Sequence, residues 1–139
     1  MRVKRILVLL LPVLLLFTGC AQLMGTSGWD TIEVTFTGSA TKDQKANYTL
    51  AITPTTATYK VNGETQKTEL PQGTWDALVT GVRALGERSS QSCPGGQTIR
   101  ITARSGGQVS QTFEASSCDA GGLFDQAKQV ADMLLRLFR

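Results

Sequence analysis

The sequence predicts an α+β domain in which an antiparallel sheet, a meander plus a hairpin, is covered by two helices. Apolar and polar residues alternate over residues 31–70 and again over 98–116, as in half-buried strands. Residues 74–86 and 123–138 instead carry apolar residues at helical spacing. The expected order is therefore β-β-β(-β)-α-β-β-α, with the helices on one face of the sheet.

The first half of the chain is expected to form the meander. Its alternating apolar positions are Ile32, Val34 and Phe36, then Tyr48, Leu50 and Ile52, then Ala57, Tyr59 and Val61. Residues 53–56 form a turn, and Asn62-Gly63 indicates a tight hairpin because both residues tolerate positive φ. A further strand can continue from Thr65 to Leu70.

A helix and a second hairpin follow the meander. Pro71 can start the helix, and Gly86 fits its C-terminal cap. The apolar face of this helix comprises Trp75, Leu78, Val79, Val82 and Leu85. In the hairpin, Ile99, Ile101 and Ala103 alternate in one arm, and Val109, Phe113 and Ala115 share one face of the other.

The turn of the second hairpin is expected at residues 105–107, with Arg104 paired with Gln108. On that register Cys118 faces position 94, next to Cys93. The chain has three cysteines, and lipidation of one, argued below, leaves these two to form a disulfide in an oxidising compartment. Such a bridge would clamp the open end of the hairpin.

The C-terminal segment is expected to be an amphipathic helix. Leu123, Ala127, Val130, Leu134 and Leu137 form its apolar stripe, widened by Phe124, Ala131 and Phe138. Asp119 is a candidate cap, and Asp132 and Arg136 form an i,i+4 pair. A membrane-surface helix is the alternative, but the polar face lacks the basic excess of such helices, and an antiparallel sheet needs a cover.

The N-terminus has the features of a signal peptide. Three positive charges in MRVKR precede the apolar run ILVLLLPVLLLF, which is too short for an ordinary membrane span. The run ends in Phe17-Thr18-Gly19-Cys20, which resembles the lipobox of bacterial lipoproteins. The resemblance implies cleavage before Cys20 and acylation of this residue by fatty acids such as palmitate.

These features predict residues 1–19 as the signal peptide, residues 20–30 as the lipidated cysteine with a short tether, and residues 31–139 as one domain. Two or more acyl chains hold a protein stably on a membrane. Ala21 after the cysteine implies the outer membrane, facing the periplasm, if the source has two membranes. The expected location is thus the bacterial cell envelope.

The net charge and the residue types of the chain argue against several classes of function. Three of the 14 Lys and Arg precede Cys20, which leaves eleven against eleven Asp and Glu, so the mature chain is close to neutral. A nucleic-acid partner, which would need a basic face, is not expected. The chain contains no histidine, which removes Ser-His-Asp and His-metal chemistry. No metal or other cofactor is expected.

The remaining motifs give little chemistry. Residues 39–42 spell S-x-x-K, but this motif belongs to a helix of a far larger fold. The acidic pairs Glu64 with Glu69 and Asp76 with Glu87 could act in acid/base chemistry, although a solvated surface is the simpler interpretation. The Gly-Gly pairs at 95–96, 106–107 and 121–122 lack the residues of a phosphate loop. Trp29 and Trp75 could stack on a ligand, and Trp75 fits the core.

The order of segments resembles that of emfourin-type inhibitors of thermolysin-like proteases. The corresponding pieces are TIEVTFTGSA, YTLAITP, TWDALVTGVRAL, TIRITARSGGQVSQTF and ADMLLRLF. The Ser-Gly-Gly segment of that family is replaced here by Thr37-Gly38-Ser39-Ala40, so no inhibitory residue is assigned.

Three functional hypotheses follow. The first is a non-enzymatic envelope lipoprotein that binds a protein or envelope component through a sheet edge or the loop at residues 37–47. The second is a tethered protease inhibitor. The third is a hydrolase that uses two carboxylates, which would have to meet in a cleft.

Overall fold

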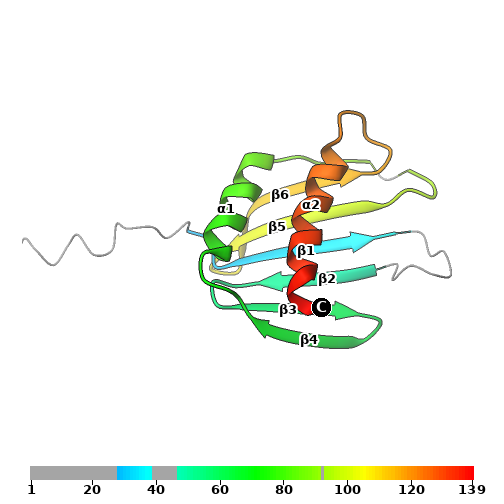
Figure 1. Ribbon diagram of the computed structural model, residues 1–139. Coiled ribbons are helices and arrows are strands. Elements are labelled where there is room, and N and C mark those ends of the chain that lie inside the picture. The colour runs from blue at the N-terminus through cyan, green and yellow to red at the C-terminus, as the bar shows by residue number, and fades with distance from the viewer. Residues whose placement is uncertain (1–27, 39–46, 92) are drawn as a thin grey trace, which may run out of the picture.

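A six-stranded antiparallel sheet with two helices on one of its faces forms the fold (Figure 1). The computed structural model describes residues 28–38, 47–91 and 93–139. The elements are β1 (Thr31–Thr37), β2 (Asn47–Ile52), β3 (Thr56–Val61), β4 (Glu64–Glu69), α1 (Thr74–Leu85), β5 (Thr98–Ser105), β6 (Gln108–Ser116), α2 (Leu123–Leu135) and a short 3₁₀ turn, η2 (Arg136–Phe138). The predicted fold class and element order are confirmed.

The strands lie in the order β4-β3-β2-β1-β5-β6. The meander β1–β4 builds one side of the sheet, with β4 at its edge. Helix α1 then carries the chain across the sheet to β5, which pairs with the other side of β1. The first strand of the domain is therefore central, and the β5–β6 hairpin reaches it only through long-range pairing.

The core lies between the sheet and the helices. Alternate residues of the central strands point to this side and are fully buried, among them Ile32, Val34 and Ile101. Leu78 and Val82 of α1 and Leu134 of α2 are buried against them. Burial of such a side chain stabilises the fold by roughly 1.5–3 kcal/mol. Both stripes predicted from helical spacing thus cover the same face of the sheet.

The β5–β6 hairpin differs from the predicted one in register. Its turn is the two-residue pair Gly106-Gly107, with φ of 58° and 79°, so Ser105 pairs with Gln108. A bulge then shifts the register, because Arg104 pairs with Val109 while Ala103 pairs with Gln111. The predicted pairing of Arg104 with Gln108 is therefore wrong.

The bulge also changes which face of the sheet Val109 occupies. The extra residue, Ser110, reverses the alternation, so Val109 points away from the helices and is 55% exposed. Phe113, beyond the bulge, is buried as predicted. Gln111 points to the helix side, where its Nε2 donates to the carbonyls of Val82 and Gly86, both at 2.8 Å. Gln111, which keeps the alternation of Phe113, thus supplies a partner for two carbonyls at the C-terminal end of α1.

Both helices begin later than predicted and without a side-chain cap. Helix α1 begins at Thr74 rather than Pro71, after Gly73 with φ of 81°. The residue before α2 is Gly122, with φ of 69°, and Asp119 does not cap this helix. Left-handed glycines take the chain into both helices.

The predicted ion pair on α2 also differs. Asp132 contacts Lys128 at 2.8 Å, one turn toward the N-terminus, instead of Arg136. Arg136 is the C-terminal cap of α2 and the first residue of the 3₁₀ turn η2, and it contacts Asp132 through its backbone N–H, which donates to the Asp132 carbonyl.

Several predictions fall outside the described residues. They are the signal peptide at 1–19, the lipidated Cys20 with most of the tether, the S-x-x-K motif at 39–42 and most of the loop at 37–47. In the part of the chain that is described, no helix has the length and apolar character needed to cross a bilayer.

Candidate functional site

The carboxylates singled out from the sequence are not brought together. Glu64 and Glu69 stand at opposite ends of β4. Asp76 lies in the first turn of α1, whereas Glu87 follows the C-terminal end of this helix. Neither pair forms the two-carboxylate cleft that the hydrolase hypothesis requires.

The glycines and tryptophans singled out from the sequence lie in turns or pack against the core. Gly106-Gly107 forms the hairpin turn, and a side chain at Gly96 would collide with the Sγ of Cys93. Trp29 and Trp75 are partly buried against the core. The guanidinium of Arg83 lies 5.0 Å from the centre of a Trp29 ring.

The face of the sheet that points away from the helices, here called the outer face, carries the most distinctive polar surface. On β5 it presents Arg100, Thr102 and Arg104, which alternate with the buried Ile99, Ile101 and Ala103. Threonines lie beside them on neighbouring strands, because Thr35 pairs with Arg100 and Thr112 with Thr102. Neither α1 nor α2 covers this face, because both lie on the opposite side of the sheet (Figure 1).

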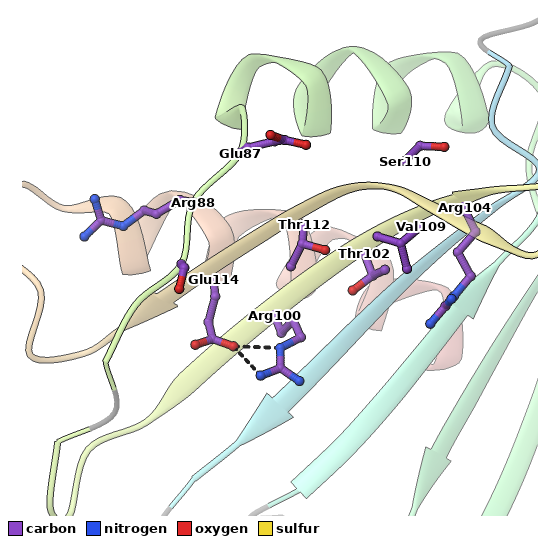
Figure 2. Close-up of a pocket in the computed structure, with 10 residues that line it drawn as sticks. Glu87, Arg88, Arg100, Thr102, Arg104, Val109, Ser110, Thr112 and Glu114 are labelled. Carbon is purple, nitrogen blue, oxygen red and sulfur yellow. Dashed lines mark hydrogen bonds and ion pairs between the residues drawn. The ribbon is translucent and has the colours of Figure 1, made fainter.

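A shallow depression of about 750 Å³ lies on the outer face over β5 and β6 (Figure 2). Its lining residues are Glu87, Arg88, Ser89, Arg100, Thr102, Arg104, Val109, Ser110, Thr112 and Glu114. The lining thus combines guanidinium groups, carboxylates and hydroxyls with one exposed apolar side chain, which the bulge has placed there.

The two arginines of β5 have different surroundings. Arg100 contacts Glu114 on the adjacent strand, with its Nε and one terminal nitrogen both 2.6 Å from the same carboxylate oxygen. Arg104 makes no side-chain hydrogen bond or ion pair with any residue that the structure describes. Figure 2 shows its side chain extending from β5 beside Thr102. Arg104 is therefore the cation of the depression best placed to receive an external anionic group.

One rim of the depression is an added piece of sheet, the edge segment (residues 87–90). The Arg88 N–H donates to the Thr112 carbonyl at 3.0 Å, and the Glu114 N–H donates to the Arg88 carbonyl at 2.9 Å. These bonds form a single parallel bridge at the edge of β6 that is not paired with β5. Part of the β6 edge is thereby closed, and Arg88 is placed at the rim.

Asp119 holds the edge segment against the end of β6. Its Oδ2 accepts the Ser116 N–H and the Ser90 hydroxyl, both at 2.7 Å, and lies 3.5 Å from the Arg88 guanidinium. These contacts, the Ser116 N–H first and the Ser90 hydroxyl second, lower the pKa of Asp119. The disulfide between Cys93 and Cys118 closes the same region, with Cα atoms 6.4 Å apart, so the predicted cysteine pairing is present.

Replacing Asp119 by Asn should weaken the fold at neutral pH, because the ionised carboxylate is the better acceptor. Since the folded-state pKa is lowered, the contribution of Asp119 is fully present above the unfolded-state pKa of about 3.9. It is lost as pH falls through the lower folded-state value. Urea unfolding of both proteins over this range should show a difference that shrinks in acid. A difference that does not vary with pH would contradict this role.

A second hollow, of about 210 Å³, lies where the sheet meets the C-terminus and is lined by Tyr48, Tyr59, Leu135, Phe138 and Arg139. The rings of Phe36 and Tyr48 stack at 5.2 Å, and Tyr59 contacts Phe138 at 5.5 Å. Burial, and secondarily the negative charge of Asp132, raise the pKa of Tyr48 to about 12. Tyr48 therefore stays a neutral phenol at physiological pH.

The two carboxylates that line the depression do not face each other. In Figure 2 the Glu114 carboxylate points to Arg100, while Glu87 lies beside the end of α1 and does not point to Glu114. Among the described residues no group of three His, Cys, Asp or Glu side chains is arranged to hold a metal ion. Exposed charges and hydroxyls on a wide polar surface are typical of the rim of a protein–protein contact.

The sequence did not single out this depression. Its signal was the alternation of Arg100, Thr102 and Arg104 with apolar residues, which marks an outer face. The hollow itself requires the bulge in β6 and the bridge formed by Arg88, neither of which has a local pattern.

Comparison with known proteins yields no family for this chain. None of the protein-family models, curated proteins and solved structures matches it. The resemblance to emfourin-type inhibitors consequently depends on the residue pattern alone.

Proposed function

We propose that this protein is a lipid-anchored, non-enzymatic component of a bacterial cell envelope that binds another protein or an envelope component through the outer face of its sheet. The observation that carries the proposal is the depression over β5 and β6, which lies on a sheet face left open by the helices. The lipobox-like Phe17-Thr18-Gly19-Cys20 supports the anchored location.

The outer face is a better candidate contact than the sheet edge. The free edge strand β4 carries Glu64, Lys67 and Glu69 among polar residues. Charged side chains on an edge discourage strand addition by another chain. The depression offers Arg104, whose side chain has no partner in the described part of the chain, together with the partly exposed Thr112, whereas Thr102 between them is largely buried.

Replacing Cys20 by Ala should release the protein from membranes, because the thiol that receives the lipid is lost. Fractionation of cells that produce the variant should move the protein from the membrane pellet to the soluble fraction, once its signal peptide has been cleaved at another site. Intact mass should show acyl chains on the parent protein only. A variant that remains with the membrane would show that the anchor lies elsewhere.

Replacing Arg104 by Glu should weaken partner binding at least tenfold, because a charge-assisted hydrogen bond of about 1.5–3 kcal/mol is replaced by repulsion. Lys67→Glu is the matched control, since it makes the same charge change on the outer face of β4, outside the depression. Cross-linking in envelopes followed by affinity measurement on the recovered partner should separate the two variants. Equal binding by both would reject the depression as the contact.

The inhibitor hypothesis is the second candidate function, favoured by the observed element order, which is the one on which the resemblance depends. Titration of the unacylated domain against a thermolysin-type protease tests it. Stoichiometric loss of protease activity is the expected result, and full residual activity with the domain intact would remove this candidate.

A further inference from the structure

One end of the sheet is fixed to the point where the tether enters the domain. The Asp30 N–H donates to the Arg104 carbonyl at 2.9 Å, and the Asp30 carboxylate accepts the Gly106 N–H at 2.6 Å. The turn at residues 53–55 lies beside them, because Ile32 pairs with Ile52. This tether end therefore comprises Trp29, Asp30, the 53–55 turn and the 106–107 turn.

The opposite end of the sheet is separated from the tether by the length of a strand. There Thr37 pairs with Asn47 and Thr98, and Tyr48 pairs with Val61, just before the Asn62-Gly63 turn. The six Cα-to-Cα steps of β1 span about 20 Å between the two ends. Figure 1 shows β1 beginning at the side where the β5–β6 hairpin turns.

The length of the tether limits how far the tether end can lie from the bilayer. Residues 21–27 separate Cys20 from Gly28, and eight Cα-to-Cα steps reach at most about 29 Å. This bound holds for any conformation of these residues. A lipid on Cys20 consequently keeps Gly28, at the tether end, within about 29 Å of the bilayer.

The tether end also has the chemistry of a membrane-contacting surface. Trp29 is only partly buried and lies under the Arg83 guanidinium, and Trp and Arg are amphipathic side chains that suit the headgroup layer. The two turns themselves present uncharged Thr, Pro and Gly residues. Of the acids near them, Asp30 is hydrogen-bonded to Gly106, and Glu69 lies on the edge strand β4, where it pairs with Thr56.

We propose that the tether end rests on the headgroup surface of the membrane that holds the Cys20 lipid, with Trp29 at the interface and the strands pointing away from the bilayer. The inference rests on the proposed lipid anchor. In this orientation the outer face of the sheet, with the depression, stands roughly perpendicular to the membrane plane. A partner anchored in the same membrane can reach it from the side.

Quenching of single tryptophans in the acylated full-length protein tests this orientation. The protein is incorporated into vesicles of phosphatidylglycerol and dibrominated phosphatidylcholine, whose bromines quench indoles within the bilayer boundary. The near reporter is Trp29 in a Trp75→Phe variant. The far reporter is Glu64→Trp combined with Trp29→Phe and Trp75→Phe, at an exposed position beside the Asn62-Gly63 turn.

Quenching of the near reporter should be several-fold stronger than that of the far reporter. Equal quenching, or stronger quenching of the far reporter, would overturn the orientation, and no quenching of either in protein that sediments with vesicles would overturn the contact. Circular dichroism of both variants verifies that they are folded. Failure of the anchor itself is recognised separately, as protein without acyl mass that does not sediment, and it removes this inference together with its premise.

Discussion

Replacing Phe113 by Ala should lower the free energy of unfolding by about 3–5 kcal/mol, the usual cost of a large aromatic deletion in a core. Phe113 is 1% exposed and lies opposite Ile101 on the adjacent strand. It also stands next to the bridge to Arg88, so relaxation of β6 into the cavity would disturb the edge segment. Because small domains have only about 5–15 kcal/mol of stability in total, the midpoint of urea unfolding should fall steeply.

Val109→Ala is the control for this prediction. The two residues have the same parity along β6 and would share a face in a regular strand, but the bulge at Ser110 places Val109 on the outer face. Its replacement should change stability by no more than about 0.5 kcal/mol. Similar losses of unfolding free energy in both variants would mean that the alternation continues unbroken along β6 and that the bulge at Ser110 is absent.

Much of the fold could be predicted because its signals are local. Ile32, Val34 and Phe36 alternate with polar residues, and this period directly identifies the buried side of β1. Asn62-Gly63 connects β3 to β4 as a two-residue hairpin, with positive φ at both residues. The apolar stripes of both helices followed from spacing in the same way.

The errors concern features that no local pattern specifies. Ser110 is an ordinary polar residue in an alternating segment, and the preceding two-residue turn at Gly106-Gly107 sets a different register from the predicted three-residue turn. The helix starts were misplaced because Pro71 and Asp119 have suitable capping chemistry, while Gly73 and Gly122 make the entry by backbone conformation instead.

The candidate site was harder to predict than the fold because its parts are distant in the chain. Arg104 and Thr112 meet in the depression because β5 pairs with β6, and the rim exists because Arg88 bridges to Phe113, which lies 25 residues later in the chain. The disulfide was the exception. Its two cysteines were predicted from their number, and the structure pairs them although the register argument that accompanied them was wrong.

Replacing Cys93 and Cys118 together by Ala should lower the free energy of unfolding by about 3 kcal/mol, as loop-closure entropy predicts for a bridge over 25 residues. Most of this loss is expected to come from the unfolded chain, which gains conformational entropy when the bridge is removed. Urea unfolding of the parent and variant proteins measures the loss. Intact mass should first show that the parent protein is lighter than its reduced form by one pair of hydrogens, and two alkylatable thiols would contradict the bridge.

The native edge segment should survive in the double variant, because its other contacts do not involve sulfur. Asp119 still accepts the Ser116 N–H and the Ser90 hydroxyl, and the two hydrogen bonds between Arg88 and β6 remain. Hydrogen exchange of the Glu114 amide should therefore accelerate only as far as the global loss of stability requires. A larger acceleration at Glu114 than in the central strand β1, each measured relative to the parent protein, would show instead that the disulfide holds the rim of the depression in the folded state. In that case its removal would also weaken partner binding at Arg104, a result that the unfolded-state account does not allow.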